Sequence, residues 1–272
     1  MGEPIPIESL DDPRIAVYRN LPDRTLDNMA GRFVAEGKLL VERLLESSLA
    51  VESVLVSQRR LGSIVARIPP DLPLYTVPEP VIHEVVGYQF HSGIIAAGIR
   101  PEPMRLDEWG DTPGQAQMLV VLPDLSMANN LGAVLRSARA MGAAGVLLGP
   151  RCCDPYYRHS VRTSMGAVFQ LPIVRSQDLA ADLATLRARR GFTCVAAVAD
   201  EPDAVSLRDA PMPMRVAIVL GNEYEGIDAV TLAACDQRVR IDMPGRFDSL
   251  NVAVAAGIIL HHYAGGAMSS GR

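Results

Sequence analysis

A chain of 272 residues, 49% of them hydrophobic and 21% charged, is typical of a globular protein with one large or two modest domains. The formal net charge of −5 argues against a protein that coats nucleic acid non-specifically, but it does not exclude a local basic surface. Because the four cysteines form no C-x-x-C pair, no signal-peptide pattern is present and no apolar run reaches ~20 residues, we expect a reduced, cytoplasmic protein without a metal site or a membrane span.

The first hundred residues predict a small α/β domain behind an extended arm. Residues 1–20 hold several prolines and acidic residues with little periodicity, which is typical of an arm. An apolar stripe at helical spacing predicts a helix over 25–48. The members of this stripe are Phe33, Leu39, Leu40, Leu44 and Leu45. Short apolar runs predict three strands, at 52–57, 74–77 and 93–98. We therefore expect a compact domain over residues 21–100.

A second and larger domain is expected after a linker. Residues 101–116 are rich in proline, glycine and charge, which is typical of a domain boundary. Over 117–272, continuous apolar runs alternate with helical patterns, as in a parallel sheet that is covered on both faces. The expected strands are 118–122, 145–148, 194–199, 216–220 and 238–241, and the expected helices lie at 130–142, 177–190 and 251–263. Ligands of such sheets bind beyond the C-terminal ends of the strands.

Three polar loops follow expected strands of this sheet. They span 123–143, 221–226 and 241–257. Each loop could also serve a purely structural purpose. Asn130 and Ser249 would then be helix N-caps, and the glycine-bracketed GNEYEG sequence of the second loop would be a plain turn. Because all three loops follow buried strands, they should meet at one edge of the sheet, which favours a ligand site.

Motifs of several common enzyme classes are absent from the chain. We find no G-x-G-x-x-G, no G-x-x-x-x-G-K-[ST], no H-E-x-x-H and no G-x-S-x-G. These absences argue against a dehydrogenase, a P-loop NTPase, a zinc protease and a serine hydrolase. They also argue against the common methyltransferase fold, in which a glycine-rich loop follows the first strand.

The three loops resemble the three motifs of SpoU-type (TrmH-like) RNA 2′-O-ribose methyltransferases, which belong to the SPOUT class. The matching stretches are NNLGAVLR at 129–136, IVLGNEYEG at 218–226 and residues 241–256, with a further match at 162–172. FVAEGKLLVERLL at 33–45 is similar to the small L30e-like RNA substrate-binding domain of many members. The resemblance implies a trefoil-knotted α/β methyltransferase domain, S-adenosylmethionine as cofactor, and a homodimer whose active site lies at or near the interface.

The resemblance also implies roles for individual residues. The catalytic residues that it implies are Arg136, Asn130, Glu223, Ser249 and Asn251. The cofactor-binding residues that the resemblance implies are Leu220, Gly221, Asn222, Ile241, Met243, Ser249 and Leu250. Arg136 would meet the ribose and the adjoining phosphate of the target nucleotide. Because a guanidinium is a poor base, Arg136 can deprotonate the 2′-hydroxyl only after giving up its own proton, for example to the phosphate. Otherwise Arg136 positions the nucleotide electrostatically, and a phosphate oxygen or water takes the proton. Both roles remain open at this point.

A segment rich in arginine and tyrosine lies between the first two motifs. The arginines of RCCDPYYRHSVRTS that we expect to contact RNA are Arg151, Arg158 and Arg162. Guanidinium groups bind phosphates and aromatic rings stack on bases, although a solvated loop is the structural alternative. Two positions depart from the family pattern, Asp242 where members often have proline and Ala253 where they often have a small polar residue.

Three hypotheses for the function follow. The first is an enzyme that methylates structured rRNA or tRNA without a metal ion. The second is an RNA-binding or ribosome-assembly module that has lost catalysis, which the acidic net charge and Asp242 allow. The third keeps the enzyme but assigns it to antibiotic resistance through rRNA methylation instead of housekeeping modification, and no residue separates these two purposes.

Overall fold

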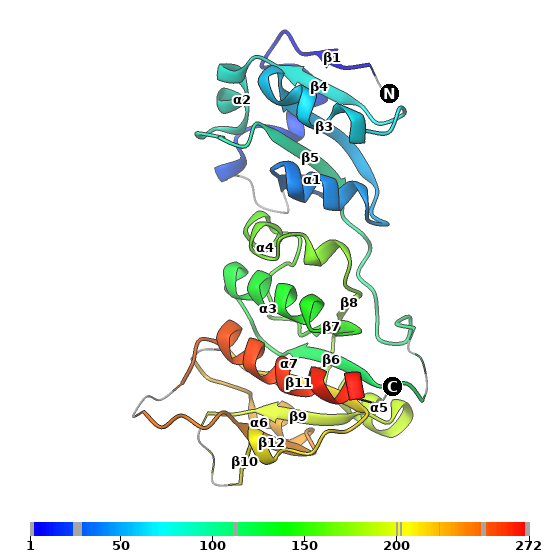
Figure 1. The fold of residues 1–272 in the computed structure, drawn as a ribbon, viewed down its shortest axis with the longest axis vertical. Coiled ribbons are helices and arrows are strands. Elements are labelled where there is room, and N and C mark those ends of the chain that lie inside the picture. The colour runs from blue at the N-terminus through cyan, green and yellow to red at the C-terminus, as the bar shows by residue number, and fades with distance from the viewer. Residues whose placement is uncertain are drawn as a thin grey trace. The chain divides into compact units, whose positions relative to one another are not determined.

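The chain folds into two compact units, shown in Figure 1. The computed structural model describes residues 3–23, 29–110, 112, 114–199, 201, 203–222, 224–245 and 249–269. The first unit consists of Met1–Glu102 and Pro155–Gln170, and the second consists of Pro103–Asp154 and Leu171–Arg272. No helix in the described part of the chain combines the length and the apolar character that a bilayer crossing requires.

The first unit is built on a five-stranded mixed sheet in the order β1-β4-β3-β5-β2. Its strands are β1 (Ile5–Pro6), β2 (Arg32–Glu36), β3 (Val51–Ser57), β4 (Leu74–Val77) and β5 (Ile94–Ile99). Its helices are α1 (Lys38–Leu45), α2 (Glu79–Val86) and α4 (Arg158–Thr163). Strand β5 pairs antiparallel with both β2 and β3, whereas β4 pairs parallel with β1 and β3. The three strands expected in this part of the chain are therefore present.

The prediction of a helix over 25–48 is wrong for the first half of that range. Residues 24–28 lie outside the described residues, Arg32–Glu36 form strand β2, and only Lys38–Leu45 are helical. In β2, Phe33 pairs with Gly98 of β5, and a Cβ at Gly98 would lie 2.4 Å from the ring carbon Cζ of Phe33. The glycine thus makes room for the ring, and this long-range pairing outweighs the helical spacing of the apolar residues.

The N-terminal residues are part of the core of the first unit and not an extended arm. Ile15 and Tyr18 are fully buried. The Tyr18 hydroxyl donates to the Ser53 carbonyl oxygen at 2.8 Å and accepts from the Ala97 backbone N–H at 3.2 Å. Burial raises the pKa of Tyr18 well above its ordinary value. A tyrosine that is anchored in this way ties the first twenty residues to β3 and β5.

The segment 155–170 folds with the first unit, although the expected boundary assigned it to the C-terminal domain. The Phe33 ring on β2 packs against the rings of Tyr156 and Phe169, with centroids 5.1 Å and 5.5 Å apart. Arg158 on α4 pairs with Glu36 at the end of β2, with Nε 3.5 Å from Oε1. These contacts make the first unit discontinuous in sequence.

The second unit contains the expected parallel sheet, with seven strands in the order β10-β12-β9-β11-β6-β7-β8. The strands are β6 (Gln117–Leu122), β7 (Gly145–Leu148), β8 (Ile173–Arg175), β9 (Thr193–Ala197), β10 (Val205–Ser206), β11 (Arg215–Leu220) and β12 (Gln237–Arg240). The helices are α3 (Ala128–Ala140), α5 (Leu179–Arg190), α6 (Ala229–Ala233) and α7 (Val252–Ser269). The short elements β8, β10 and α6 were not expected from the sequence, because they hold too few residues to show a period.

Helices cover the sheet of the second unit. Side chains of α5, among them Leu183 and Leu186, form one core cluster with Leu119 and Val121 of β6. Helices α3 and α7 run beside each other and contact β7, β6 and β11. The residues of β6 from Leu119 to Leu122 are all fully buried, as expected for a central strand of a covered parallel sheet.

Candidate functional site

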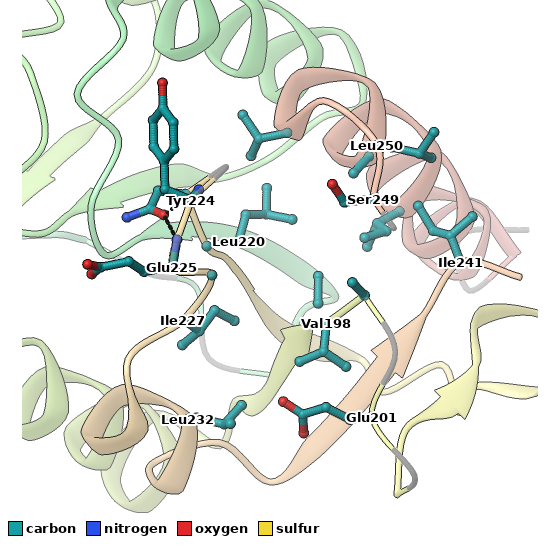
Figure 2. A pocket seen from close by; sticks show the side chains of 18 of the residues that line it. Val198, Glu201, Leu220, Tyr224, Glu225, Ile227, Leu232, Ile241, Ser249 and Leu250 are labelled. Atoms are coloured by element: carbon teal, nitrogen blue, oxygen red, sulfur yellow. Dashed lines mark hydrogen bonds between the residues drawn. The ribbon is translucent and has the colours of Figure 1, made fainter. Parts of the chain in front are cut away.

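The loops that follow β9, β11 and β12 enclose a cavity of about 380 Å³, drawn in Figure 2. This volume falls within the ~300–1,000 Å³ of sites for small molecules. Apolar side chains form much of its wall, namely Leu220, Ile227, Leu232, Ile241, Leu250 and Ile259. Polar side chains also line it, namely Glu201, Asn222, Tyr224, Glu225 and Ser249. The cavity therefore suits a ligand with an apolar part and a charged or hydrogen-bonding part.

A tight turn after β11 forms one side of the cavity. The Asn222 backbone N–H donates to the Gly226 carbonyl oxygen at 3.2 Å, and Gly226 has a φ of +70°. A Cβ at Gly221 would lie 2.3 Å from the Gly226 carbonyl carbon, so only glycine fits at that position without a shift of the backbone. The tight turn expected between these two glycines is confirmed.

The Asn222 side chain holds this turn from inside. Its Oδ1 accepts from the backbone N–H groups of Tyr224 at 3.0 Å and Glu225 at 2.7 Å. Its Nδ2 donates to Oδ2 of Asp124, in the loop after β6, at 3.3 Å. The same Asp124 oxygen lies 3.0 Å from Nε of Arg151. The hydrogen bond between Asn222 and Asp124 thus connects the second polar loop to the first. Arg151 is joined to both loops through the same Asp124 carboxylate.

A pair of asparagines connects the first and third polar loops. Asn251 Nδ2 donates to Asn130 Oδ1 at 3.3 Å, although the two residues are 121 positions apart. Asn251 Oδ1 accepts from the Ala253 backbone N–H at 3.0 Å, so that Asn251 caps helix α7. Helix α3 begins at Ala128, after Met127. The alternative in which Asn130 and Ser249 are helix N-caps is therefore wrong.

The seven residues expected to bind a cofactor all line the cavity. They are Leu220, Gly221, Asn222, Ile241, Met243, Ser249 and Leu250. Of the expected catalytic set, Asn130 and Asn251 are joined and Ser249 lines the cavity. Glu223 lies outside the described residues.

Arg136 lies apart from the cavity in this chain. It is exposed on α3, six residues and therefore about 9 Å of helix rise beyond Asn130. Its side chain makes no hydrogen bond or ion pair with any residue that the structure describes. The side chain is therefore free to reach a molecule that approaches α3 from solvent.

The three arginines expected to contact RNA belong to both units of the chain. Arg151 belongs to the second unit, whereas Arg158 and Arg162 lie on α4 in the first unit. Arg158 pairs with Glu36, and its guanidinium lies over the Tyr88 ring, 5.2 Å from the centroid. These contacts give Arg158 a structural role in the first unit, while Arg151 and Arg162 are exposed.

The sequence did not predict the position of Glu201 in the cavity wall or the contacts of Asp242. Glu201, beyond the end of β9, lines the cavity and accepts a hydrogen bond from Arg238 Nη1 at 2.8 Å. Asp242 accepts a hydrogen bond from the Ser206 hydroxyl, and its Oδ1 lies 3.6 Å from Nε of Arg240. The departure at Asp242 therefore connects the loop after β12 to β10. The contacts of Glu201 with Arg238 and of Asp242 with Ser206 have no sequence signal, because the two residues of each pair are more than thirty positions apart.

Metal binding finds no support in the described residues. Within them, no group of three or more histidine, cysteine, aspartate or glutamate side chains could hold a metal ion. All four cysteines are free thiols. Burial raises the pKa of Cys152 to about 11, and this thiol accepts a hydrogen bond from the Leu125 backbone N–H at 3.3 Å.

Comparisons with known proteins point to one family. Residues 117–261 match the model of the SpoU rRNA Methylase family. An uncharacterised tRNA/rRNA methyltransferase of Mycobacterium tuberculosis is 34% identical, over 92% of this chain and 88% of the relative. The 23S rRNA (guanosine(2553)-2′-O)-methyltransferase of Bacillus subtilis is 27% identical, over 95% of this chain and 99% of the relative. The crystal structure of an AdoMet-bound rRNA methyltransferase from Sinorhizobium meliloti superposes with a TM-score of 0.81 at 25% identity, covering 96% of this chain and 98% of that one.

Proposed function

The chain belongs to the SpoU rRNA methylase family, and from this premise we propose that it transfers a methyl group from S-adenosylmethionine to a ribose 2′-hydroxyl in rRNA or tRNA. The observation that carries the proposal is that the loops after β9, β11 and β12 line one cavity, while the Asn251–Asn130 hydrogen bond joins the polar loop after β6 to the loop after β12. The family relationship and the named activities of the relatives support the reaction class and the RNA substrate.

The cavity residues fit S-adenosylmethionine. The apolar wall formed by Leu220, Ile241 and Leu250 suits an adenine ring, and the close approach of Gly221 to Gly226 leaves backbone groups at the cavity surface. The carboxylates of Glu201 and Glu225 suit a cofactor that carries a sulfonium and an ammonium group. When it is bound, S-adenosylmethionine supplies the methyl group for the transfer.

The asparagine pair has a positioning role in this proposal. Asn251 fixes the start of α7 through its cap and fixes Asn130 through its amide. Because Asn130 lies in the first turn of α3, the pair also sets where Arg136 leaves that helix. Arg136 then binds the phosphate beside the target ribose with its planar guanidinium. In this arrangement Arg136 orients the 2′-hydroxyl and stabilises negative charge that develops on the oxygen. The hydroxyl proton passes to a phosphate oxygen or to water, because a guanidinium is a poor base.

We propose a homodimer with the active site close to its interface. Arg136 does not line the cavity of its own chain, so a site complete in one copy would leave it unused. Helix α7 exposes Val254 and Ile258, four residues apart on one face, with 53% and 40% of each residue accessible. An apolar strip of this kind is suited to contact with a second copy. The trefoil knot expected of the family stays a prediction.

The test is to map ribose methylation in rRNA and tRNA from cells with and without the gene, and then to restore the modification with purified protein and S-adenosylmethionine. We expect one 2′-O-methyl group to disappear on deletion and to return with the wild-type protein but not with Arg136→Ala. Wild-type protein that binds S-adenosylmethionine and RNA but restores no methyl group would refute the proposal and favour a module without catalysis. Susceptibility of the deletion strain to ribosome-targeting antibiotics separates resistance from housekeeping.

A further inference from the structure

Tyr224 stands out on the surface of the second unit. It is 84% exposed, and no other phenylalanine, tyrosine or tryptophan in the described part of the chain is mostly exposed. It nevertheless lines the cavity, at the tip of the turn after β11. A large aromatic ring held in water beside a ligand site, in a chain with only 5% aromatic residues, indicates a partner that covers the ring.

The ring is presented from a backbone that is held in place. The Tyr224 N–H donates to Asn222 Oδ1 at 3.0 Å, and the turn closes through the Asn222–Gly226 hydrogen bond at 3.2 Å. Figure 2 shows the ring projecting away from Ile227 and Leu232, which lie on the other side of the cavity. The ring therefore points out of the cavity, where a macromolecular substrate approaches, and not toward its apolar wall.

Charges around the ring indicate which part of an RNA it meets. Glu225 follows Tyr224 directly and lines the cavity, and Asn222 contacts the carboxylate of Asp124. These acidic groups repel a phosphate but not a neutral base. Arg151, which pairs with the same Asp124 and keeps 62% of its side chain exposed, offers a cation for a neighbouring phosphate.

We propose that Tyr224 stacks on a base of the RNA substrate at or beside the target nucleotide, with Arg151 on a flanking phosphate. The inference rests on the proposed function and deepens it by naming the part of the substrate that meets this loop. Stacking is largely independent of base identity, so Tyr224 contributes to the affinity for the RNA and not to the selection of a particular base.

The test compares three variants of the full chain. Tyr224→Phe keeps the aromatic face, Tyr224→Leu keeps an apolar side chain without that face, and Tyr224→Ala removes both. The probe is an RNA hairpin that carries 2-aminopurine in its loop, because stacking on an aromatic ring quenches this fluorophore. We expect quenching with the wild type and Tyr224→Phe only, and RNA affinity roughly tenfold to a hundredfold weaker for Tyr224→Leu and Tyr224→Ala.

Two further measurements distinguish stacking on RNA from contact of the ring with the cofactor or with a second copy of the chain. Calorimetric affinity for S-adenosylmethionine should fall much less than RNA affinity in Tyr224→Leu and Tyr224→Ala, because the ring projects away from Ile227 and Leu232 of the cavity wall. A large loss would place the ring over the cofactor and overturn the proposal. A shift toward monomer in sedimentation would assign the ring to a second copy and overturn it as well.

Failure of this inference is distinguishable from failure of the proposed function. If the wild-type protein methylates RNA and Tyr224→Ala binds and methylates it equally well, only the stacking role is refuted. If the wild-type protein binds no S-adenosylmethionine, both are refuted.

Discussion

Replacement of Gly221 by alanine tests how closely the turn after β11 must pack for the cavity to form. The new Cβ would lie 2.3 Å from the Gly226 carbonyl carbon, 2.6 Å from its oxygen and 2.7 Å from the Ile227 nitrogen. All three are backbone atoms, so no side chain can rotate away. Ordinary contact begins at 3.4 Å, and the two sides of the turn must therefore separate by about 1 Å.

The cost of this separation can be estimated from its parts. Overpacking in a fixed environment costs about 1–3 kcal/mol. Loss of the Asn222–Gly226 hydrogen bond adds about 1 kcal/mol. If the whole cost of about 2–4 kcal/mol falls on the form that binds the cofactor, the affinity for S-adenosylmethionine falls roughly 30-fold to 1,000-fold.

The assay for Gly221→Ala is calorimetric titration with S-adenosylmethionine together with urea unfolding. Gly62→Ala is the matched control, because a Cβ at Gly62 meets nothing within 4 Å and the residue lies in the first unit. We expect the control to bind the cofactor like the wild type. If Gly221→Ala retains both wild-type affinity and wild-type stability, the turn does not impose the geometry described for it and the reasoning is refuted.

Substitutions at Arg136, Asn251 and Cys152 give three further tests. Arg136→Lys keeps the positive charge but loses the planar guanidinium, so kcat should fall roughly 10²- to 10⁴-fold without loss of cofactor affinity. The control Arg139→Lys, on the same helix, should leave kcat unchanged. Equal kcat values for the two variants would contradict the role proposed for Arg136. Asn251→Asp keeps the cap of α7 but places a carboxylate oxygen against Asn130 Oδ1. The methylation rate should therefore fall, while the unfolding midpoint stays close to that of the wild type. Asn251→Ala also removes the cap and should destabilise the protein by about 1 kcal/mol. Burial raises the pKa of Cys152 to about 11, above that of the unfolded chain, so its contribution to stability is complete below pH ~9 and is lost as the pH rises toward 11. Urea unfolding between pH 8 and pH 11 should therefore show a smaller loss of stability for Cys152→Ala than for the wild type, and identical losses would count against this view.

The central sheet and the cavity were accessible from the sequence because their signals are local. Each strand of the parallel sheet is a short apolar run, and the run Leu119–Leu122 is buried on both faces as such runs predict. Gly221 and Gly226 indicated the tight turn for the same reason, because the lack of a Cβ is a property of glycine itself and needs no distant partner. Resemblance to a family then supplied the seven expected cofactor-binding residues, all of which line the cavity and which periodicity alone did not distinguish from caps and turns.

Elements that depend on distant partners were not predictable in this way. Strand β2 has a helical apolar spacing, but Phe33 needs the space over Gly98, 65 positions away. Tyr18 shows no period at all and is fixed by Ser53 and Ala97. Asp242 gains its role only from Ser206 on the neighbouring strand. In each case the deciding interaction joins residues that no window along the chain contains.

The backbone passes between the two units three times, after Glu102, Asp154 and Gln170. Truncation before residue 103 would therefore not release an intact catalytic fragment, because it would strip the support from the segment 155–170. Val161, Val168 and Phe169, all buried in the whole protein, would be left without their cover and would favour aggregation. A shortened version therefore needs polar replacements at these three positions.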